Sequence, residues 1–240
     1  MIKVLYKDKH IIVCEKPVNI LSEHVSNTLR TMPDIIKKMT GVYRVDVVHR
    51  LDKMVGGTMV YSLNGKATKV LSEMVRNHKI VKEYLAVVHG KPDPAEGEMR
   101  DYLFKDSAKN KSFVVKTLRK GAKEALLEYK LIKTITTDDG EVSLVKVRLH
   151  TGRTHQIRVQ FSSRKMPLLG DGKYGSHDNG CFIALWSHHL AFRHPTFKRD
   201  VDEYSLPPIK DYPWKLFRGE LEGYAKDIEA TKSRKDDMNV

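Results

Sequence analysis

Short apolar runs and amphipathic periods divide the chain into predicted elements. Residues 2–6 and 10–15, IKVLY and HIIVCE, lie on either side of a polar turn and predict a β-hairpin. Residues 65–78 carry apolar side chains at the spacing i, i+3, i+4, i+7 and i+8, which predicts a helix with one buried face. Asn64 stands directly before this helix and is a favourable N-cap residue. Strand and helix patterns therefore follow one another along the chain.

The same reasoning gives the remaining elements. Residues 26–40 predict a helix capped by Ser26 or Asn27, and residues 154–164 predict a short helix capped by Thr154. Strands are expected over 58–63, 80–89 and 181–194, a strand–loop–strand unit over 95–120, and a last helix over 214–229.

Length and composition fit one folded domain. A chain of 240 residues with 40% hydrophobic and 30% charged residues can bury a full core. We assign residues 1–230 to a single catalytic domain and residues 231–240 to a charged tail that we expect to be disordered. No window approaches ~18 consecutive apolar residues, and the N-terminus has no secretory apolar segment. A membrane span and export are therefore not expected, and the sequence predicts a cytoplasmic protein.

Cysteine and histidine spacing gives no sign of a metal centre. Cys14 and Cys181 form no CxxC pair and are expected to be buried, reduced thiols. The 11 histidines show neither an HExxH motif nor Cys/His ligand spacing. We therefore expect no bound metal.

The charge balance indicates the class of partner. Lys and Arg number 43 against 30 Asp and Glu, a formal net charge of +13. An excess of this size favours a polyanionic partner, and nucleic acid ranks ahead of an anionic membrane because no basic amphipathic helix has an aromatic face.

Two stretches carry the candidate chemistry. In Val47–Asn64, VVHRLDKMVGGTMVYSLN, Asp52 directly follows His49-Arg50-Leu51. The second stretch is Leu149–Gly175, LHTGRTHQIRVQFSSRKMPLLGDGKYG. Together they resemble the RluA-type pseudouridine synthases, whose motifs read HRLD, then GR-[ST]-HQ-[IL]-R, then Pro-x-x-GD-x-x-Y. The resemblance extends from about residue 4 to about residue 209.

The resemblance implies both a fold and an activity. The fold would be α+β, with a mixed, mostly antiparallel central sheet flanked by helices and loops and a catalytic cleft across the sheet. The activity would be isomerisation of uridines in ribosomal or transfer RNA, on a flipped-out base, by a monomer that needs no cofactor and no obligatory protein partner. It also implies a strand over 122–134, where propensity predicts a helix. The family often has an N-terminal S4-type RNA-binding domain, for which we expect no room in this chain.

The resemblance assigns the catalytic roles as well. Asp52 would be the nucleophile, and Arg153 would be the guanidinium that keeps its carboxylate ionised. Tyr84 resembles the family tyrosine that stacks on the target base. From the residues alone, Arg153 remains open as a phosphate contact and Tyr84 as a core aromatic side chain.

Four further residues complete the expected site. Arg50 resembles the arginine that fills the gap left by the flipped uridine, although it remains open as a local partner of Asp52. Leu185 would pack beneath the base, and His49 and Arg158 are further candidates for substrate binding or support of the loop.

Two positions depart from the family pattern, and one alternative function stays open. Asn19 stands where a KPxG loop has glycine, and asparagine tolerates the left-handed conformation better than most residues. Met54-Val55-Gly56 replaces the usual residues after HRLD. The alternative to an enzyme is a catalytically impaired RNA-binding or ribosome-assembly factor that retains the fold.

Overall fold

The strands of the protein join in one mixed sheet. The computed structural model describes residues 2–25, 30–178 and 180–237. In this part of the chain the strands are β1 (Val4–Lys7), β2 (Ile11–Lys16), β3 (Asp46–Val47), β4 (Gly56–Ser62), β5 (Val81–His89), β6 (Glu96–Asp106), β7 (Lys111–Val115), β8 (Ala122–Thr137), β9 (Gly140–Leu149), β10 (Leu185–Arg193) and β11 (Asp200–Tyr204).

Strand order and direction confirm the predicted α+β fold. The described strands form an 11-stranded sheet with the order β1-β2-β4-β10-β5-β9-β8-β6-β7, while β3 pairs with β4 and β11 with β10. The β10–β4 pair is parallel, and the other strand pairs are antiparallel. The predicted hairpin is confirmed by β1 and β2, and the strand predicted over residues 80–89 lies centrally as β5.

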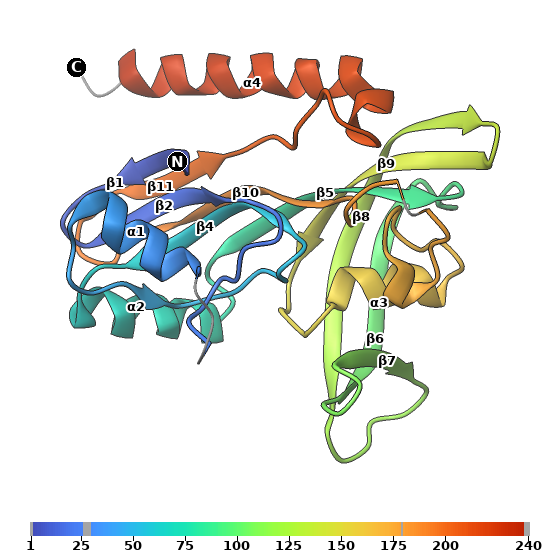
Figure 1. The fold of residues 1–240 in the computed structure, drawn as a ribbon, viewed down its shortest axis with the longest axis horizontal. Coiled ribbons are helices and arrows are strands. Elements are labelled where there is room, and N and C mark those ends of the chain that lie inside the picture. Colours follow the sequence, from blue (N-terminus) through green and yellow to red (C-terminus); the bar gives the residue numbers. More distant parts are fainter. Residues whose placement is uncertain (1, 26–29, 179, 238–240) are drawn as a thin grey trace.

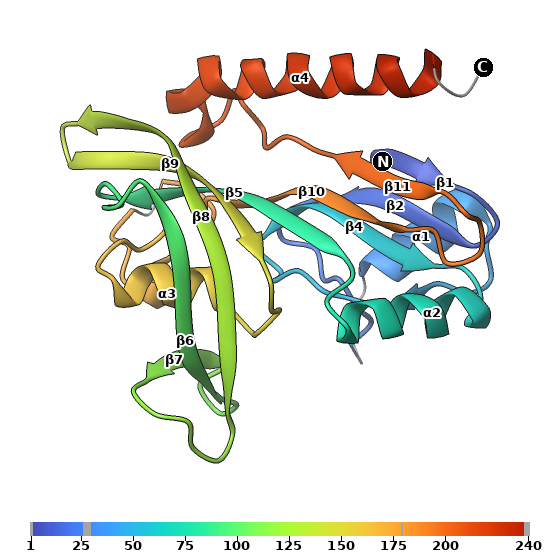
Figure 2. The same cartoon turned by 180° about the vertical axis from the view of Figure 1, so that it is seen from behind.

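Helices cover both sides of this sheet (Figures 1 and 2). They are α1 (Met32–Thr40), α2 (Gly65–Arg76), α3 (Gln156–Ser163) and α4 (Arg218–Asp237), with the short 3₁₀ helices η1 (Gly172–Tyr174) and η2 (Trp214–Phe217).

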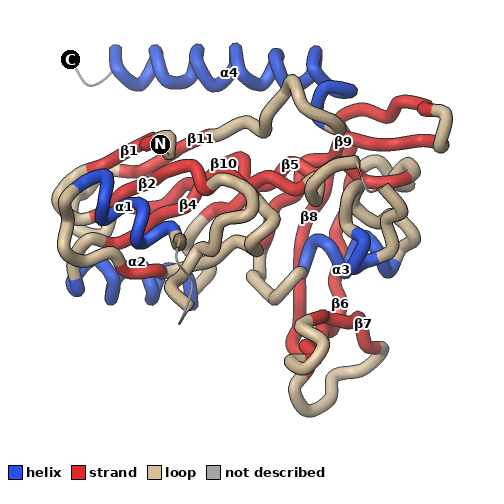
Figure 3. The backbone as a smooth tube through the Cα atoms, viewed as in Figure 1, coloured by secondary structure: helices blue, strands red, loops and turns tan. Residues whose placement is uncertain are grey.

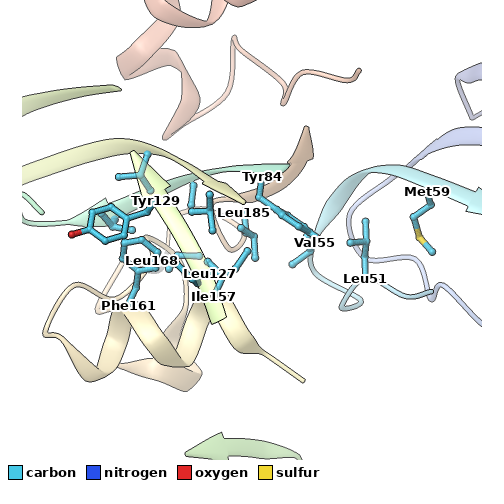
Figure 4. Close-up of a cluster of buried hydrophobic side chains, with 14 of the residues drawn as sticks. Leu51, Val55, Met59, Tyr84, Leu127, Tyr129, Ile157, Phe161, Leu168 and Leu185 are labelled. Atoms are coloured by element: carbon cyan, nitrogen blue, oxygen red, sulfur yellow. The ribbon is translucent and has the colours of Figure 1, made fainter. Parts of the chain in front are cut away.

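The alternation of side chains along β5 explains the layers on either side of the sheet. Leu85 and Val87 pack in one buried cluster with residues of η2 and α4. Tyr84 points to the other face, where it shares a cluster with Ile157 and Phe161 of α3. Figure 4 shows this second cluster, in which Tyr84 lies between Val55 and Leu185.

The start of α2 agrees with its prediction, whereas the start of α1 does not. The Asn64 side chain accepts a hydrogen bond from the backbone N–H of Ala67 at 3.0 Å. Helix α1 begins at Met32, not at residue 26, because Thr31 is its N-cap and its backbone N–H and hydroxyl both donate to the Asp34 carboxylate. The caps expected at positions 26 and 27 lie outside the described residues.

Strand pairing overrides helical propensity in β8. Residues 122–134 are strand, as the family resemblance implied, because β8 pairs with β6 on one edge and with β9 on the other. Ala125, Leu127 and Tyr129 alternate as buried residues along it, so their burial depends on the strand conformation.

Two other boundaries differ from the sequence expectation. Helix α3 begins after His155, whose φ of 55° makes it the N-cap in place of Thr154. Helix α4 continues to Asp237, so most of the charged tail is helical and the expectation of disorder for this part is wrong.

The strands β6, β7 and β8 extend away from the rest of the sheet as an arm (Figure 3). Strand β7 pairs with the end of β6, over Tyr102–Asp106, and this pairing gives the arm a third strand. The lysine-rich loop that the sequence predicted between two strands is shorter than expected. Lys109 is exposed in the loop, whereas the exposed Lys105 lies in β6.

The junction of β4 and β10 generates a stability prediction. Gly57 has φ of 116°, and a Cβ atom built on it would lie 2.2 Å from the carbonyl oxygen of Ser187. Replacing Gly57 with Ala should therefore lower the free energy of unfolding by about 3 kcal/mol, from backbone strain and overpacking. Urea denaturation measures this. Gly223→Ala, in helix α4 with open space around the added methyl group, should instead stabilise by about 0.5–1 kcal/mol.

Candidate active site

Two cavities meet at the loop that carries Asp52. The larger has a volume of about 660 Å³ and the smaller about 260 Å³, and both are lined by Asp52, His155 and Arg158. Every residue that the sequence assigned to the site lines the larger cavity: His49, Arg50, Asp52, Tyr84, Arg153, Arg158 and Leu185. The motifs therefore located the cavity, and the geometry now distinguishes the residues within it.

Asp52 forms an ion pair with Arg158. The Nη1 atom of Arg158 donates to Oδ2 of Asp52 at 2.8 Å. The other edge of the guanidinium is taken by Asp171, with Nε to Oδ2 at 2.6 Å and Nη2 to Oδ1 at 2.8 Å. Asp171 and Arg158 are 1% and 6% exposed, whereas Asp52 is 25% exposed. The pair of hydrogen bonds to Asp171 fixes the guanidinium, and the fixed guanidinium then orients a carboxylate that solvent or a ligand can reach.

The ion pair expected between Asp52 and Arg153 is therefore wrong, because the partner of Asp52 is Arg158. Nε of Arg153 donates to the backbone carbonyl of Glu124 at 2.8 Å. Arg153 precedes His155, which has a left-handed backbone conformation, whereas Arg158 lies within α3. The two side chains therefore start from different parts of the backbone and reach different partners. Burial acts to lower the pKa of Arg158, but its hydrogen bonds and attraction to Asp171 and Asp52 outweigh burial and raise that pKa.

His155 lies beside the ion pair as a neutral ring. Its Nε2 atom is 3.8 Å from Oδ2 of Asp52, and its Nδ1 atom shares a 2.9 Å hydrogen bond with the Tyr174 hydroxyl. Burial lowers the pKa of His155 to about 4, against the attraction of Asp52. The imidazole is consequently uncharged at neutral pH, and Arg158 is the cation in contact with Asp52.

Tyr84 and Leu185 form an apolar wall of the larger cavity. They are 6% and 5% exposed and belong to the same buried cluster, shown in Figure 4. Burial, and then the charge of Asp52, raise the pKa of Tyr84, so its hydroxyl stays protonated at neutral pH and is a hydrogen-bond donor. Tyr84 is therefore a core aromatic side chain that also lines the cavity, and its stacking on the target base stays a prediction.

Arg50 does not pair with Asp52. Its Nη1 atom lies 2.6 Å from Oε1 of Glu23, and both side chains are exposed at the edge shared by the two cavities. The local pairing that the sequence left open is therefore wrong, and Arg50 is placed where an entering molecule would meet it.

His49 supports the Asp52 loop from beneath. Its Nε2 atom accepts a hydrogen bond from the backbone N–H of Val60 in β4 at 3.2 Å. Burial of the ring, and then the positive charge of Lys82, lower the pKa of His49 to about 3. A neutral ring is needed for this acceptor role, so the low pKa and the hydrogen bond agree.

A buried serine holds the residue just before Asp52. The Ser22 hydroxyl donates to the carbonyl oxygen of Leu51 at 2.7 Å and accepts from the Leu51 N–H at 3.0 Å. The Tyr61 hydroxyl donates to the backbone carbonyl of Ser22 at 3.1 Å, which attaches the serine to β4. One hydroxyl thus satisfies both backbone groups of Leu51.

A buried lysine holds the residue just after Asp52. The ammonium group of Lys16, which is fully buried, donates to the carbonyl oxygens of Pro17, Ile20 and Lys53 at 2.8, 2.7 and 3.1 Å. Asn19, in the turn between these carbonyls, has φ of 64°, the left-handed conformation expected for it. Burial lowers the pKa of Lys16 to about 7, against the attraction of Asp52.

Sequence reasoning missed three of these supporting residues. Asp171 lies in the GD segment of the second motif, which was the available signal for it. Lys16 lies in the KPxG-like loop, but its side-chain partners are backbone carbonyls that sequence patterns do not specify. Ser22 has no sequence signal, since its bond to Leu51 joins positions 29 residues apart.

The described residues offer no obvious metal site and no membrane span. Within residues 2–25, 30–178 and 180–237, no group of three or more His, Cys, Asp or Glu side chains could hold a metal ion. The helices of this part are too short or too polar to cross a bilayer.

Comparison with known proteins decides the family. The profile described as RNA pseudouridylate synthase matches residues 10–163. The chain belongs to this family. The matched range contains Asp52, Tyr84, Arg153 and Arg158, and therefore both members of the ion pair that the structure shows.

Curated relatives agree with this assignment. The chain is 35% identical over 213 residues to an uncharacterized RNA pseudouridine synthase of Aquifex aeolicus, covering 81% of this chain and 66% of that protein. It is 32% identical to the ribosomal large subunit pseudouridine synthase D of Borreliella burgdorferi, covering 74% of this chain and 56% of that protein. The chain thus spans less than two thirds of the length of these two relatives.

Solved structures show the same fold. Human RNA Pseudouridylate Synthase Domain Containing 4 superposes with a TM-score of 0.72 at 22% identity, covering 90% of this chain and 92% of the human chain. Human RNA Pseudouridylate Synthase Domain Containing 1 gives a TM-score of 0.74 at 20% identity, with 87% and 84% covered.

The serine that holds Leu51 can be tested by amide exchange. Ser22→Ala leaves the N–H and C=O of Leu51 without their partner, so the Leu51 amide should exchange faster by roughly tenfold or more. The free energy of unfolding should fall by about 1–3 kcal/mol. Ser163→Ala is the matched control, because it removes a hydroxyl that bonds only within the α3 region. Unchanged exchange at Leu51 in Ser22→Ala would contradict this role.

His49 predicts a specific loss of stability in acid. Between its folded pKa of about 3 and the ordinary unfolded value, the unfolded chain binds one proton more than the folded chain. Stability is therefore lost as pH falls below about 6.5, and His49 alone should account for about 2 kcal/mol between pH 7 and pH 5. Urea denaturation at several pH values should show a weaker pH dependence in His49→Gln. His177→Gln, which removes an exposed ring, should follow the original protein.

Proposed function

We propose that the protein isomerises uridine in RNA to pseudouridine, with Asp52 as the nucleophile. The observation that carries the proposal is a reachable Asp52 carboxylate, held by Arg158, at a cavity of about 660 Å³. A cavity of this size is in the range of ligand sites, about 300–1,000 Å³. Membership of the RNA pseudouridylate synthase family supplies the reaction class.

The reaction needs only groups that this site contains. The bond between C1′ of the ribose and N1 of uracil breaks, the base turns, and a bond from C1′ to C5 forms. One proton leaves C5 and one is gained at N1, so the product has the same composition as the substrate. Asp52 would act on the ribose or the base as nucleophile or base, with its carboxylate held by the hydrogen bond from Arg158. No oxidant, energy source or group donor enters the balance, and we therefore propose no cofactor.

The cavity walls fit a base that has left its stack. Tyr84 and Leu185 present apolar surface to one side of Asp52. A flipped uracil packed on them would remain shielded from water during the rotation. Arg50, exposed at the cavity edge, would occupy the space that the uridine leaves in the RNA stack. Its pairing with Glu23 is with an exposed side chain, so RNA can displace it at small cost.

Charge and the arm favour RNA as the substrate. The net charge of +13 supports contact with a polyanion, and the arm exposes cationic side chains suited to backbone phosphates. These are Lys105, Lys109, Lys116, Arg119 and Lys120. The relative in Borreliella burgdorferi is named for the large ribosomal subunit, and we favour ribosomal RNA over transfer RNA on that basis.

Removal of the Asp52 carboxylate tests the activity. Pseudouridines are mapped across total RNA in cells with and without the gene, and in cells that carry Asp52→Asn or Asp52→Ala. We expect one or a few sites to disappear without the gene and to stay absent with either variant, while RNA affinity of the purified variants remains within about threefold. The small change in affinity is expected because Asp52 repels phosphates and contributes no cationic contact.

The matched control removes an exposed carboxylate far from the cavity. Asp200→Asn, on β11, should restore every site. Pseudouridine formed by Asp52→Ala would refute the nucleophile assignment. No change in any site on deletion of the gene, together with intact RNA binding, would instead support the RNA-binding or assembly factor.

A further inference from the structure

The charges around the larger cavity do not balance. Its carboxylates, among the described residues, are Glu23 and Asp52, and each already has an arginine partner, Arg50 at 2.6 Å and Arg158 at 2.8 Å. Three further cationic side chains line the same cavity, Arg76, Lys82 and Arg153. Within the described part of the chain, none of the three forms an ion pair with a carboxylate.

The three cations come from three different segments of the chain that line the cavity. Arg76 is in the last turn of α2, Lys82 is near the start of β5, and Arg153 follows β9. The Lys82 ammonium group lies 3.6 Å from the position that a Cβ atom on Gly152 would occupy, so it is next to the backbone that carries Arg153.

Lys82 is the least favourable of these charges in the absence of a ligand. Its side chain is partly buried, no described group accepts a hydrogen bond from its ammonium group, and burial lowers its pKa. Partial loss of hydration costs a cation free energy, which an incoming anion would recover. Nε of Arg153 donates to the Glu124 carbonyl, which fixes the guanidinium of a residue that lines the cavity, and its terminal nitrogens are available to an anion.

We propose that Lys82 and Arg153, with Arg76 beside them, form an anion subsite that takes an RNA backbone phosphate next to the target uridine. Lys82 and Tyr84 lie two residues apart on β5, on the same face and about 7 Å apart along the strand. A nucleotide whose base packs on Tyr84 would therefore bring a phosphate of its own ribose within reach of Lys82. The inference rests on the proposed function for the identity of the ligand, and it assigns to Arg153 the phosphate contact.

The test compares two small probes, uridine and uridine 3′,5′-bisphosphate. Binding is followed by titration of backbone amide signals, including that of Gly152, at fixed ionic strength. We expect the bisphosphate to bind at least about tenfold more tightly than uridine, as for a charge-assisted contact. Lys82→Gln and Arg153→Gln should each reduce this ratio to less than about threefold. Lys82→Arg, which keeps the charge, should preserve most of it.

Lys198→Gln is the matched control for loss of charge. Lys198 is exposed between β10 and β11, and its removal lowers the net charge by the same amount, so it should leave the ratio unchanged. Equal binding of both probes by the original protein would overturn the subsite, as would a bisphosphate advantage that survives both Lys82→Gln and Arg153→Gln. If Lys82→Gln does not fold, Arg153→Gln decides the question alone.

The test of the anion subsite can be distinguished from the test of the proposed reaction. The same comparison in Asp52→Ala should show the full bisphosphate advantage, because Asp52 does not contact the three cations. A bisphosphate advantage without any pseudouridine formation would leave the subsite standing and remove the activity. Pseudouridine formation without a bisphosphate advantage would do the reverse.

Discussion

The site depends on one guanidinium that is shared between two carboxylates. Arg158 binds Asp171 through two nitrogens and Asp52 through the third. The three residues come from the loop before β4, from α3 and from the turn before η1, so this contact joins segments more than a hundred positions apart. The buried pair with Asp171 fixes the direction of the guanidinium, and the reachable carboxylate of Asp52 is then oriented by it.

A fixed partner alone would not hold a loop in position. Ser22 binds both backbone groups of Leu51, and Lys16 binds the carbonyl of Lys53, so the residues on both sides of Asp52 are tied to the same preceding segment. His49 adds a bond from the start of the loop to β4. These supports use buried polar groups with satisfied hydrogen bonds, which favour a single loop conformation because any other would leave them unpaired.

The sequence predicted the location of the site more fully than its internal contacts. The two motifs contain Asp52, Arg153 and Arg158, and the family resemblance added Tyr84; all four line one cavity because the fold brings their loops and strands together. Spacing could not decide which arginine meets Asp52. Arg153 and Arg158 are five residues apart, and the left-handed turn at His155 between them determines where each side chain lies.

The fold shows the same division between local and long-range information. The cap at Asn64 and the hairpin of β1 and β2 were predicted because their signals are local. Propensity failed over residues 122–134, where pairing on both edges makes a strand of residues that favour a helix. The helical tail up to Asp237 likewise departs from the expectation that composition gave.

The side chains that line the larger cavity include more cations than carboxylates. Asp52 shares its guanidinium with the buried Asp171, and Arg50 and Glu23 cancel at the edge. The cations of the cavity wall that have no carboxylate partner among the described residues are Arg76, Lys82 and Arg153. A nucleotide carries its negative charge on the phosphates, whereas its base and sugar are uncharged. Since Asp52 repels phosphate and these three cations attract it, the field of the cavity favours the orientation in which the ribose, and not the phosphate, faces the nucleophile.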